Sequence, residues 1–202
     1  MESFIIQPNE YLKTQIEAWY NSKYYGGHSH IPGRIENMIC TLKNDINIKS
    51  EDDIDLINAQ NRLNDILNTD LSVIKNSIDS DLTICVVPRA KVQYLPHQLL
   101  FKQTIQQVVN QINVEDGTNY ILRDTNTQTT HRARAGYGGS GCPPYKGITT
   151  DTCSISDNVI GKTILLIDDV YTPSINIDED AIQALLDKGA SQVYFYAVGH
   201  TF

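Results

Sequence analysis

The chain has few cysteines and no long apolar run, and both shortages narrow the class of protein. Its four cysteines in 202 residues include no Cys-x-x-Cys pair, so neither a disulfide framework nor a common zinc motif is indicated. A zinc site built from Cys142, Cys153, His28 and His30 would match no usual ligand spacing. No stretch approaches the ~20 apolar residues of a membrane-spanning helix, and the N-terminus lacks a signal-peptide pattern. We therefore expect a reduced, cytoplasmic protein with no membrane partner.

Basic residues are also scarce, and they are unevenly distributed. The net charge of the chain is −8; residues 1–81 and 150–202 each carry −6, whereas residues 82–149 carry +4. Positive charge gathered in the middle of an acidic protein indicates a polyanionic ligand. No continuous basic stripe or DNA-reading helix accompanies it, so nucleic acid is not the expected partner. A metabolite that carries a pyrophosphate group fits better.

Apolar spacing predicts a helical segment over residues 1–80, which could cap a site, and an α/β core over residues 81–202. The expected N-terminal helices are one that begins at Pro8-Asn9 with Leu12, Ile16, Trp19 and Tyr20 on one face, then Arg34–Leu42 and Asp53–Leu67. Core strands are expected at 82–87, 120–122, 162–167 and 192–198, and core helices at 97–112 and 178–188. Strands that alternate with helices predict a doubly wound parallel sheet.

Two adjacent acids follow the most apolar of these strands. Residues 164–167 are Ile-Leu-Leu-Ile, and Asp168 and Asp169 come next. Open α/β sheets bind ligands at the carboxyl ends of their strands, where these acids are expected. The segment that follows offers hydroxyl and amide groups from Thr172, Ser174 and Asn176 before a helix begins. Because helix N-termini and loop amides bind phosphate, the pattern indicates a site for a ribose 5-phosphate.

Residues 164–176 resemble the phosphoribosyl pyrophosphate signature of type I phosphoribosyltransferases, and the resemblance extends faintly from about residue 82 to the C-terminus. Within the family it is nearest to the competence-protein ComF type. It implies a doubly wound sheet of that kind, with Asp168 and Asp169 holding the ribose 2- and 3-hydroxyls and, through ribose and water, Mg²⁺. The implied 5-phosphate loop is Thr172, Pro173, Ser174, Ile175 and Asn176.

This loop departs from the Thr-Thr-Gly-x-Thr pattern that the family favours. Pro173 removes one amide donor, and Asn176 supplies an amide where a hydroxyl is usual. Ser174 is small enough to keep the backbone close to a phosphate. Two other interpretations of the paired acids are a magnesium site of the response-regulator kind and a simple helix cap.

A second candidate site element follows the first core strand. It consists of Pro88, Arg89, Ala90 and Lys91, and the resemblance makes it the pyrophosphate loop. The guanidinium group of Arg89 suits phosphate oxygens. The alternative is a solvated basic turn. No acid occurs between Leu82 and Val114, so local ion pairs are not expected to neutralise these cations.

The third candidate element is the long, glycine-rich stretch 123–150. Its length indicates either a functional loop or a disordered linker. The resemblance implies a flexible lid over the pyrophosphate, with Arg132 and Arg134 as catalytic cations. Residues Tyr24, Tyr25, His28 and His30 have two interpretations, a hood over an acceptor or partial core.

The resemblance implies an enzyme of nucleotide metabolism, a glycosyltransferase. It would move ribose 5-phosphate from phosphoribosyl pyrophosphate to a nucleobase or amine with Mg²⁺ and release pyrophosphate, as a homodimer if it follows the family habit. A non-catalytic sensor of phosphoribosyl pyrophosphate or a nucleotide is the alternative, because one fold hosts many functions. A DNA-processing accessory protein is disfavoured by the acidic charge.

Overall fold

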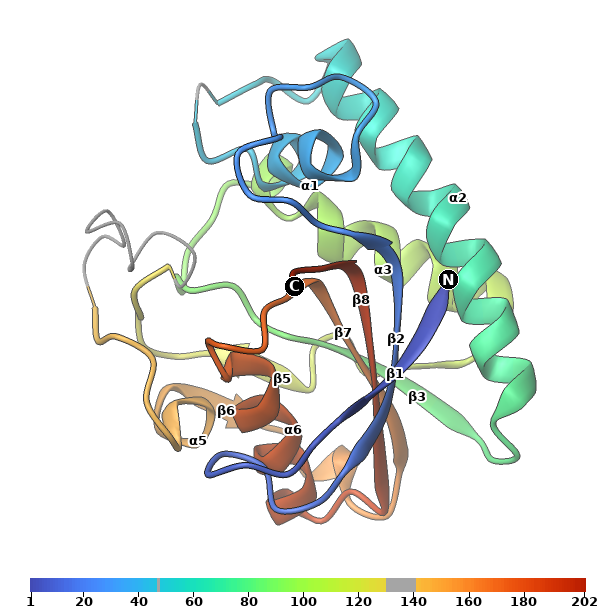
Figure 1. Ribbon diagram of the computed structural model, residues 1–202, viewed down its shortest axis with the longest axis vertical. Helices are drawn as coiled ribbons and strands as arrows, with labels where there is room; N and C mark the ends of the chain where they lie inside the picture. Colours follow the sequence, from blue (N-terminus) through green and yellow to red (C-terminus); the bar gives the residue numbers. More distant parts are fainter. Residues whose placement is uncertain (47, 130–140) are drawn as a thin grey trace.

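The computed structural model describes residues 1–46, 48–129 and 141–202, and its centre is a mostly parallel six-stranded sheet (Figure 1). The strand order is β1-β2-β8-β7-β3-β4. The strands are β1 (Glu2–Ile6), β2 (Ile16–Lys23), β3 (Leu82–Val86), β4 (Glu115–Asp116), β7 (Thr163–Tyr171) and β8 (Gln192–His200). All neighbours pair in parallel except β1 and β2. The protein is therefore a mixed α/β protein, as predicted.

Helices cover both faces of this sheet (Figure 1). One face carries α1 (Ile35–Lys43), α2 (Ile54–Ser77) and α3 (Leu100–Ile112), and the other carries α6 (Ile177–Lys188). Side chains of β7 alternate between the two cores: Leu165 and Ile167 pack with α1–α3, whereas Ile164 and Leu166 pack with α6. A strand whose two faces are both buried must be apolar throughout, which explains the Ile-Leu-Leu-Ile run.

The helix predicted from Pro8-Asn9 to Tyr20 is wrong, because these residues lead into and form β2. Ile16, Ala18 and Tyr20 are buried and Glu17 is exposed, which is the two-residue period of a strand rather than a helical face. β1 pairs antiparallel with β2, and β2 pairs with β8. The N-terminal segment thus supplies two strands to the central sheet.

The other predicted helices are present with shifted ends. The Arg34–Leu42 prediction corresponds to α1 and the 97–112 prediction to α3. The helix predicted at Asp53–Leu67 is confirmed as α2, which is 24 residues long and ends later than predicted, at Ser77. It starts where predicted, since the Asp53 side chain accepts hydrogen bonds from the amides of Asp55 and Leu56. No helix in the described part of the chain is long and apolar enough to cross a membrane.

The strand predicted at 120–122 exists but lies outside the central sheet. It is β5 (Ile121–Arg123), and it pairs antiparallel with β6 (Cys153–Ile155) after the short helix α5 (Ile148–Thr152). The described part of the long stretch contacts the rest of the protein, because the Thr127 amide donates to the Ala90 carbonyl at 2.8 Å. Within the stretch, the Gln128 amide donates to the Cys142 carbonyl at 2.9 Å.

Candidate functional site

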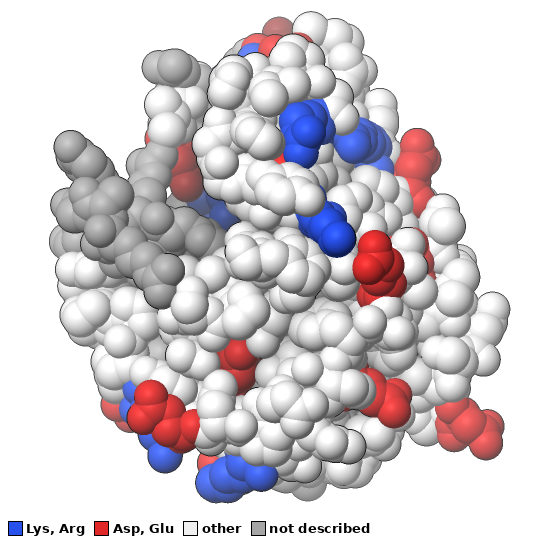
Figure 2. Space-filling model, in the orientation of Figure 1, with Lys and Arg blue, Asp and Glu red and all other residues white. Residues whose placement is uncertain are grey.

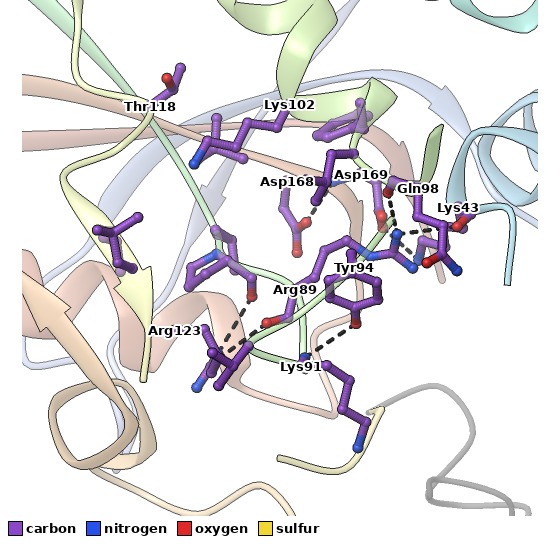
Figure 3. Close-up of a pocket in the computed structure, with 18 of the residues that line it drawn as sticks. Lys43, Arg89, Lys91, Tyr94, Gln98, Lys102, Thr118, Arg123, Asp168 and Asp169 are labelled. Carbon is purple, nitrogen blue, oxygen red and sulfur yellow. Dashed lines mark hydrogen bonds and ion pairs between the residues drawn. The ribbon is translucent and has the colours of Figure 1, made fainter. Parts of the chain in front are cut away.

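A cavity of about 640 Å³ opens at the carboxyl ends of β3 and β7 (Figure 3). Parallel strands place ligand sites at this edge. Its apolar lining comes from α1, β3, α3 and β5 and includes Leu42, Val86, Val87, Leu99, Phe101, Ile121 and Leu122. Its charged lining is Lys43, Arg89, Lys91, Lys102, Arg123, Asp124, Asp168 and Asp169. The two acids and Pro88, Arg89 and Lys91, three of the four residues proposed for the pyrophosphate loop, therefore share one cavity. Ala90 lies beside it, in a smaller adjoining pocket of about 90 Å³.

The two acids lie within β7 rather than beyond it. The strand was predicted to end at Ile167, but it continues to Tyr171 because Val170 and Tyr171 pair with Gly199 and His200 of β8. Neighbouring residues of a strand point to opposite faces. Asp168 and Asp169 therefore meet different partners.

Asp169 faces α1 and forms an ion pair with Lys43, whose Nζ lies 2.9 Å from Oδ1. The pair is largely buried, with side chains 27% and 15% exposed. Burial lowers the pKa of Lys43, but attraction to Asp169 outweighs this, and the net shift of that pKa is upward.

Asp168 faces α6 and meets another carboxyl group, that of Asp178. Burial, followed by the charge of Asp169, raises the pKa of Asp168 to about 7. Burial and the charge of Asp168 raise the pKa of Asp178 well above its usual value. The two carboxyls share a hydrogen bond, which requires a proton on one of them. The pair therefore holds a proton more tightly than an isolated aspartate does.

The predicted 5-phosphate loop, residues 172–176, connects β7 to α6. It turns through a hydrogen bond of 3.0 Å from the Ile175 amide to the Thr172 carbonyl, and Pro173 and Ser174 are exposed. The buried Thr172 hydroxyl has no hydrogen-bond partner among the described residues. Asn176 adopts a left-handed conformation, and its side-chain oxygen accepts a hydrogen bond from Asn9 at 2.9 Å. The loop does not line the main cavity; its neighbour Ile177 lines the smaller pocket, together with Asp168, Asp169 and Arg89.

Three buried acids begin α6, and the sequence analysis did not assign them a role. Asp178 faces Asp168 as described. Glu179 accepts a hydrogen bond from the Tyr171 hydroxyl at 2.7 Å, and Asp180 accepts one from the Thr149 amide at 2.8 Å. The sequence does contain a pattern that could have identified them, because three consecutive acids follow the predicted phosphate loop after one residue, Ile177. Acids stabilise a helix N-terminus, but they also oppose a bound anion.

Arg89 is held by groups of the protein itself. Its guanidinium donates hydrogen bonds to the carbonyls of Lys43, at 3.1 Å, and Gln98, and it pairs with Asp45 at 2.7 Å. It also stacks over the ring of Tyr94, 4.0 Å from the ring centre. The acid that neutralises this cation is not a local one, as expected, but Asp45, which is distant in sequence and adjacent in space, does neutralise it.

Lys91 and Arg123 hold the same loop from the other side. The Lys91 ammonium donates to the Thr127 carbonyl at 2.6 Å. Arg123 donates to the carbonyls of Arg89, at 3.1 Å, and Pro88, at 3.4 Å. Arg123 thus orients the backbone of the predicted pyrophosphate loop. The predicted catalytic residues Arg132 and Arg134 lie outside the described residues.

Lys102 lines the cavity from α3 and was not selected from the sequence. Its ammonium donates to the side-chain oxygen of Asn119 at 2.7 Å, and burial lowers its pKa. Lys102 lies in the same acid-free part of the sequence as Arg89, between Leu82 and Val114. The criterion that selected Arg89 would therefore have selected Lys102 too. Tyr24, Tyr25, His28 and His30, for which a hood was one of two interpretations, are not among the residues that line the cavity.

Oxygen donors suited to Mg²⁺ are present at the acids of β7. Mg²⁺ prefers oxygen and commonly binds through one or two carboxylates, water and substrate phosphates, so Asp168 and Asp169 fit an indirect site. Among residues 1–46, 48–129 and 141–202, no three His, Cys, Asp or Glu side chains are grouped to hold a metal ion directly.

No protein-family model matches the chain, and no curated protein matches it.

Proposed function

We propose that this protein is a phosphoribosyltransferase that transfers ribose 5-phosphate from phosphoribosyl pyrophosphate to a nucleobase or amine. The observation that carries the proposal is the placement of Asp168 and Asp169 on β7, in a cavity that is also lined by the loop after β3. The two acids lie in the segment that carries the resemblance, residues 164–176, and the basic loop precedes that segment by some 75 residues. Both line the same cavity. The type I phosphoribosyltransferase fold is part of this proposal.

In this proposal the two acids bind the ribose from one side of the cavity. Asp169, ionised and neutralised by Lys43, accepts a hydrogen bond from one ribose hydroxyl. Asp168, whose pKa is about 7, accepts one from the other hydroxyl when it is ionised. Asp168 and Asp169 would hold Mg²⁺ indirectly, and the ion would neutralise charge on the leaving pyrophosphate. Positioning and electrostatics provide the rate, and no protein nucleophile is required.

The loop 172–176 binds the 5-phosphate. The unpartnered Thr172 hydroxyl is a donor available to an oxyanion. The acids that follow would repel a phosphate if all three were ionised and unpartnered. Glu179 and Asp180 accept hydrogen bonds within the protein, and the pKa of Asp178 is raised well above its usual value. A proton shared by Asp168 and Asp178 reduces the negative charge beside the first turn of α6, which favours phosphate binding.

A non-catalytic sensor on the same site is the second candidate, and the bonding of Arg89 favours it. That guanidinium contacts two carbonyls and Asp45, so binding pyrophosphate would require it to leave three partners. A nucleic-acid partner is disfavoured by the surface charge, because acidic and basic side chains are scattered over the described part of the face in Figure 2 and form no continuous basic stripe there.

Pyrophosphate release separates the enzyme from the sensor. The wild type and the Thr172→Ala, Ser174→Ala double variant are incubated with Mg²⁺, phosphoribosyl pyrophosphate and a pool of purines, pyrimidines, glutamine and ammonia. An enzyme releases pyrophosphate in the wild type and far less in the variant. Tight binding of phosphoribosyl pyrophosphate with no release in any pool supports the sensor, and the absence of binding contradicts both.

A variant of the two arginines in the long stretch, Arg132 and Arg134, tests the same proposal in a second way. The Arg132→Ala, Arg134→Ala variant is expected to lose pyrophosphate release while its urea midpoint stays unchanged, because the proposal assigns both cations to the leaving group. Unchanged release would remove them from the mechanism.

A further inference from the structure

Lys102 is the cavity-lining cation on α3, and its described bonding is sparser than that of Lys43, Arg89 and Arg123. Lys43 pairs with Asp169, Arg89 pairs with Asp45, and Arg123 donates to carbonyls. Lys102 has a single described hydrogen-bond acceptor, the neutral amide oxygen of Asn119, and no carboxylate of the described chain lies within ion-pair distance of it. A cation held only by a neutral oxygen remains available to an anion.

The apolar surroundings of Lys102 disfavour its charged form. Its neighbour Phe101 lines the same cavity, and Ile121 and Leu122 line it from β5. The acid that influences its charge, Asp116, is already bonded to the amide and hydroxyl of Thr118, at 2.9 and 2.6 Å. An ammonium group beside apolar walls is stabilised when a ligand brings the opposite charge.

We propose that the cavity takes an acceptor with a flat apolar ring and a carboxylate, and that Lys102 binds this carboxylate. The identity of this ligand as an acceptor rests on the proposed phosphoribosyl transfer, but its binding does not. In Figure 3 Lys102 and Thr118 lie on one side of Asp168, and Lys43 and Gln98 lie on the other. A ring seated among the apolar side chains would therefore have the carboxylate site at one end and the proposed ribose site at the other. A volume of about 640 Å³ is in the range of small-molecule sites.

Matched ligand pairs test the charge requirement. Pyridine-3-carboxylate and pyridine-3-carboxamide share a ring and differ in charge, as do uracil-6-carboxylate and uracil. Calorimetric titration of the full chain, with and without Mg²⁺–phosphoribosyl pyrophosphate, is expected to give at least about tenfold tighter binding of one carboxylate than of its neutral partner. Equal affinity within both pairs, or no binding of either carboxylate, overturns the inference.

Variants of Lys102 assign the discrimination to this side chain. Lys102→Met is expected to abolish the preference for the carboxylate, and Lys102→Arg is expected to keep most of it. Lys75→Met is the matched control: Lys75 also donates to neutral oxygens, the carbonyls of Ile112 and Asn113 at the end of α3, but it does not line the cavity. If Lys102→Met keeps the preference at an unchanged urea midpoint, Lys102 only anchors the loop of Asn119 and the inference is wrong.

The outcomes for the two proposals are distinguishable. Carboxylate binding that depends on Lys102, together with no binding of phosphoribosyl pyrophosphate, supports the anion site and contradicts the proposed function. Binding of phosphoribosyl pyrophosphate with no preference for either carboxylate leaves the proposed function standing and overturns the Lys102 inference.

Discussion

Two adjacent aspartates of β7, Asp168 and Asp169, meet partners of opposite charge type on the two faces of the central sheet. On the face of α1, Asp169 meets a cation, Lys43, 2.9 Å away. On the face of α6, Asp168 meets a second carboxyl, that of Asp178, and its pKa rises to about 7. A one-residue step along a strand changes the partner from a base to an acid, because successive side chains point to opposite faces.

The difference shows how one Asp-Asp pair can supply two functions. Asp169 is paired with the cation Lys43, whereas the pKa of Asp168 is about 7 and its charge changes near neutral pH. The proposed site thus has one acceptor that is paired with a cation and one that responds to pH.

The largest expected effect comes from removing the cation on the α1 face. Lys43→Met leaves Asp169 charged, largely buried and unpaired, so the free energy of unfolding should fall by about 2–4 kcal/mol. Urea unfolding at pH 7 measures this. Lys13→Met is the control, because Lys13 and Asp187 are exposed by 72% and 58%, and an exposed pair contributes only about 0–1 kcal/mol. Equal losses in the two variants would show that the Lys43–Asp169 pair is not a special feature of this face.

The next effect concerns ligand binding. Asp169→Asn keeps the shape of the side chain and removes the acceptor charge, so the affinity for Mg²⁺–phosphoribosyl pyrophosphate should fall by about 1.5–3 kcal/mol. Calorimetric titration compares it with Asp168→Asn, whose loss should be larger at pH 8 than at pH 6 because wild-type Asp168 is protonated at the lower pH. Wild-type affinity in Asp169→Asn would remove this acid from the site.

A third effect isolates the carboxyl pair on the α6 face. The pKa of Asp168 is raised from 3.8 to about 7, so between these values the unfolded chain has lost a proton that the folded protein retains. Stability from this group is therefore present below pH 4 and is lost as the pH rises to 7. Burial and the charge of Asp169 cause this shift, so Asp178→Asn should leave the Asp168 contribution in place. The variant should remove the separate loss that comes from Asp178, whose own pKa is also raised.

Urea unfolding at several pH values measures the difference between the wild type and Asp178→Asn. The difference is needed because other acids act in the opposite direction at lower pH. Burial opposes ionisation of Glu36, but its bonds to Arg34 and Tyr25 outweigh burial and lower its pKa to about 2, so its contribution is lost only as the pH falls below about 4.5. Parallel profiles in the two proteins would contradict the assignment to the carboxyl pair.

The sheet was predictable where the sequence period is unambiguous. The Ile-Leu-Leu-Ile run, the alternating helices and the acids at the ligand-binding edge all follow from local pattern. β2 was not predictable in this way, because Ile16, Trp19 and Tyr20 fit a helical face as well as a strand, and pairing with β1 and β8 decides between them. Such tertiary choices commonly override local preference.

The partners of the site residues could not be predicted for a related reason. Asp45 neutralises Arg89 from 44 positions away, and Lys43 reaches Asp169 from a different helix. Both contacts depend on where α1 packs on the sheet. Sequence pattern identified which residues carry charge near the site; the fold determines which of those charges remain for a ligand.

The smallest expected effect concerns how the α6 face holds the loop 172–176. Asn9 donates to the side-chain oxygen of Asn176 at 2.9 Å, and both residues lie near the surface. Asn9 also accepts hydrogen bonds from the amides of Tyr11 and Leu12. Asn9→Asp keeps those acceptors and removes only the donor, so stability should fall by less than about 1 kcal/mol, well below the loss in Lys43→Met. Asn9→Ala, which removes the acceptors too, should lose more. A loss in Asn9→Asp as large as that in Lys43→Met would mean that the two faces hold the site equally firmly, and the contrast between them would then be confined to charge.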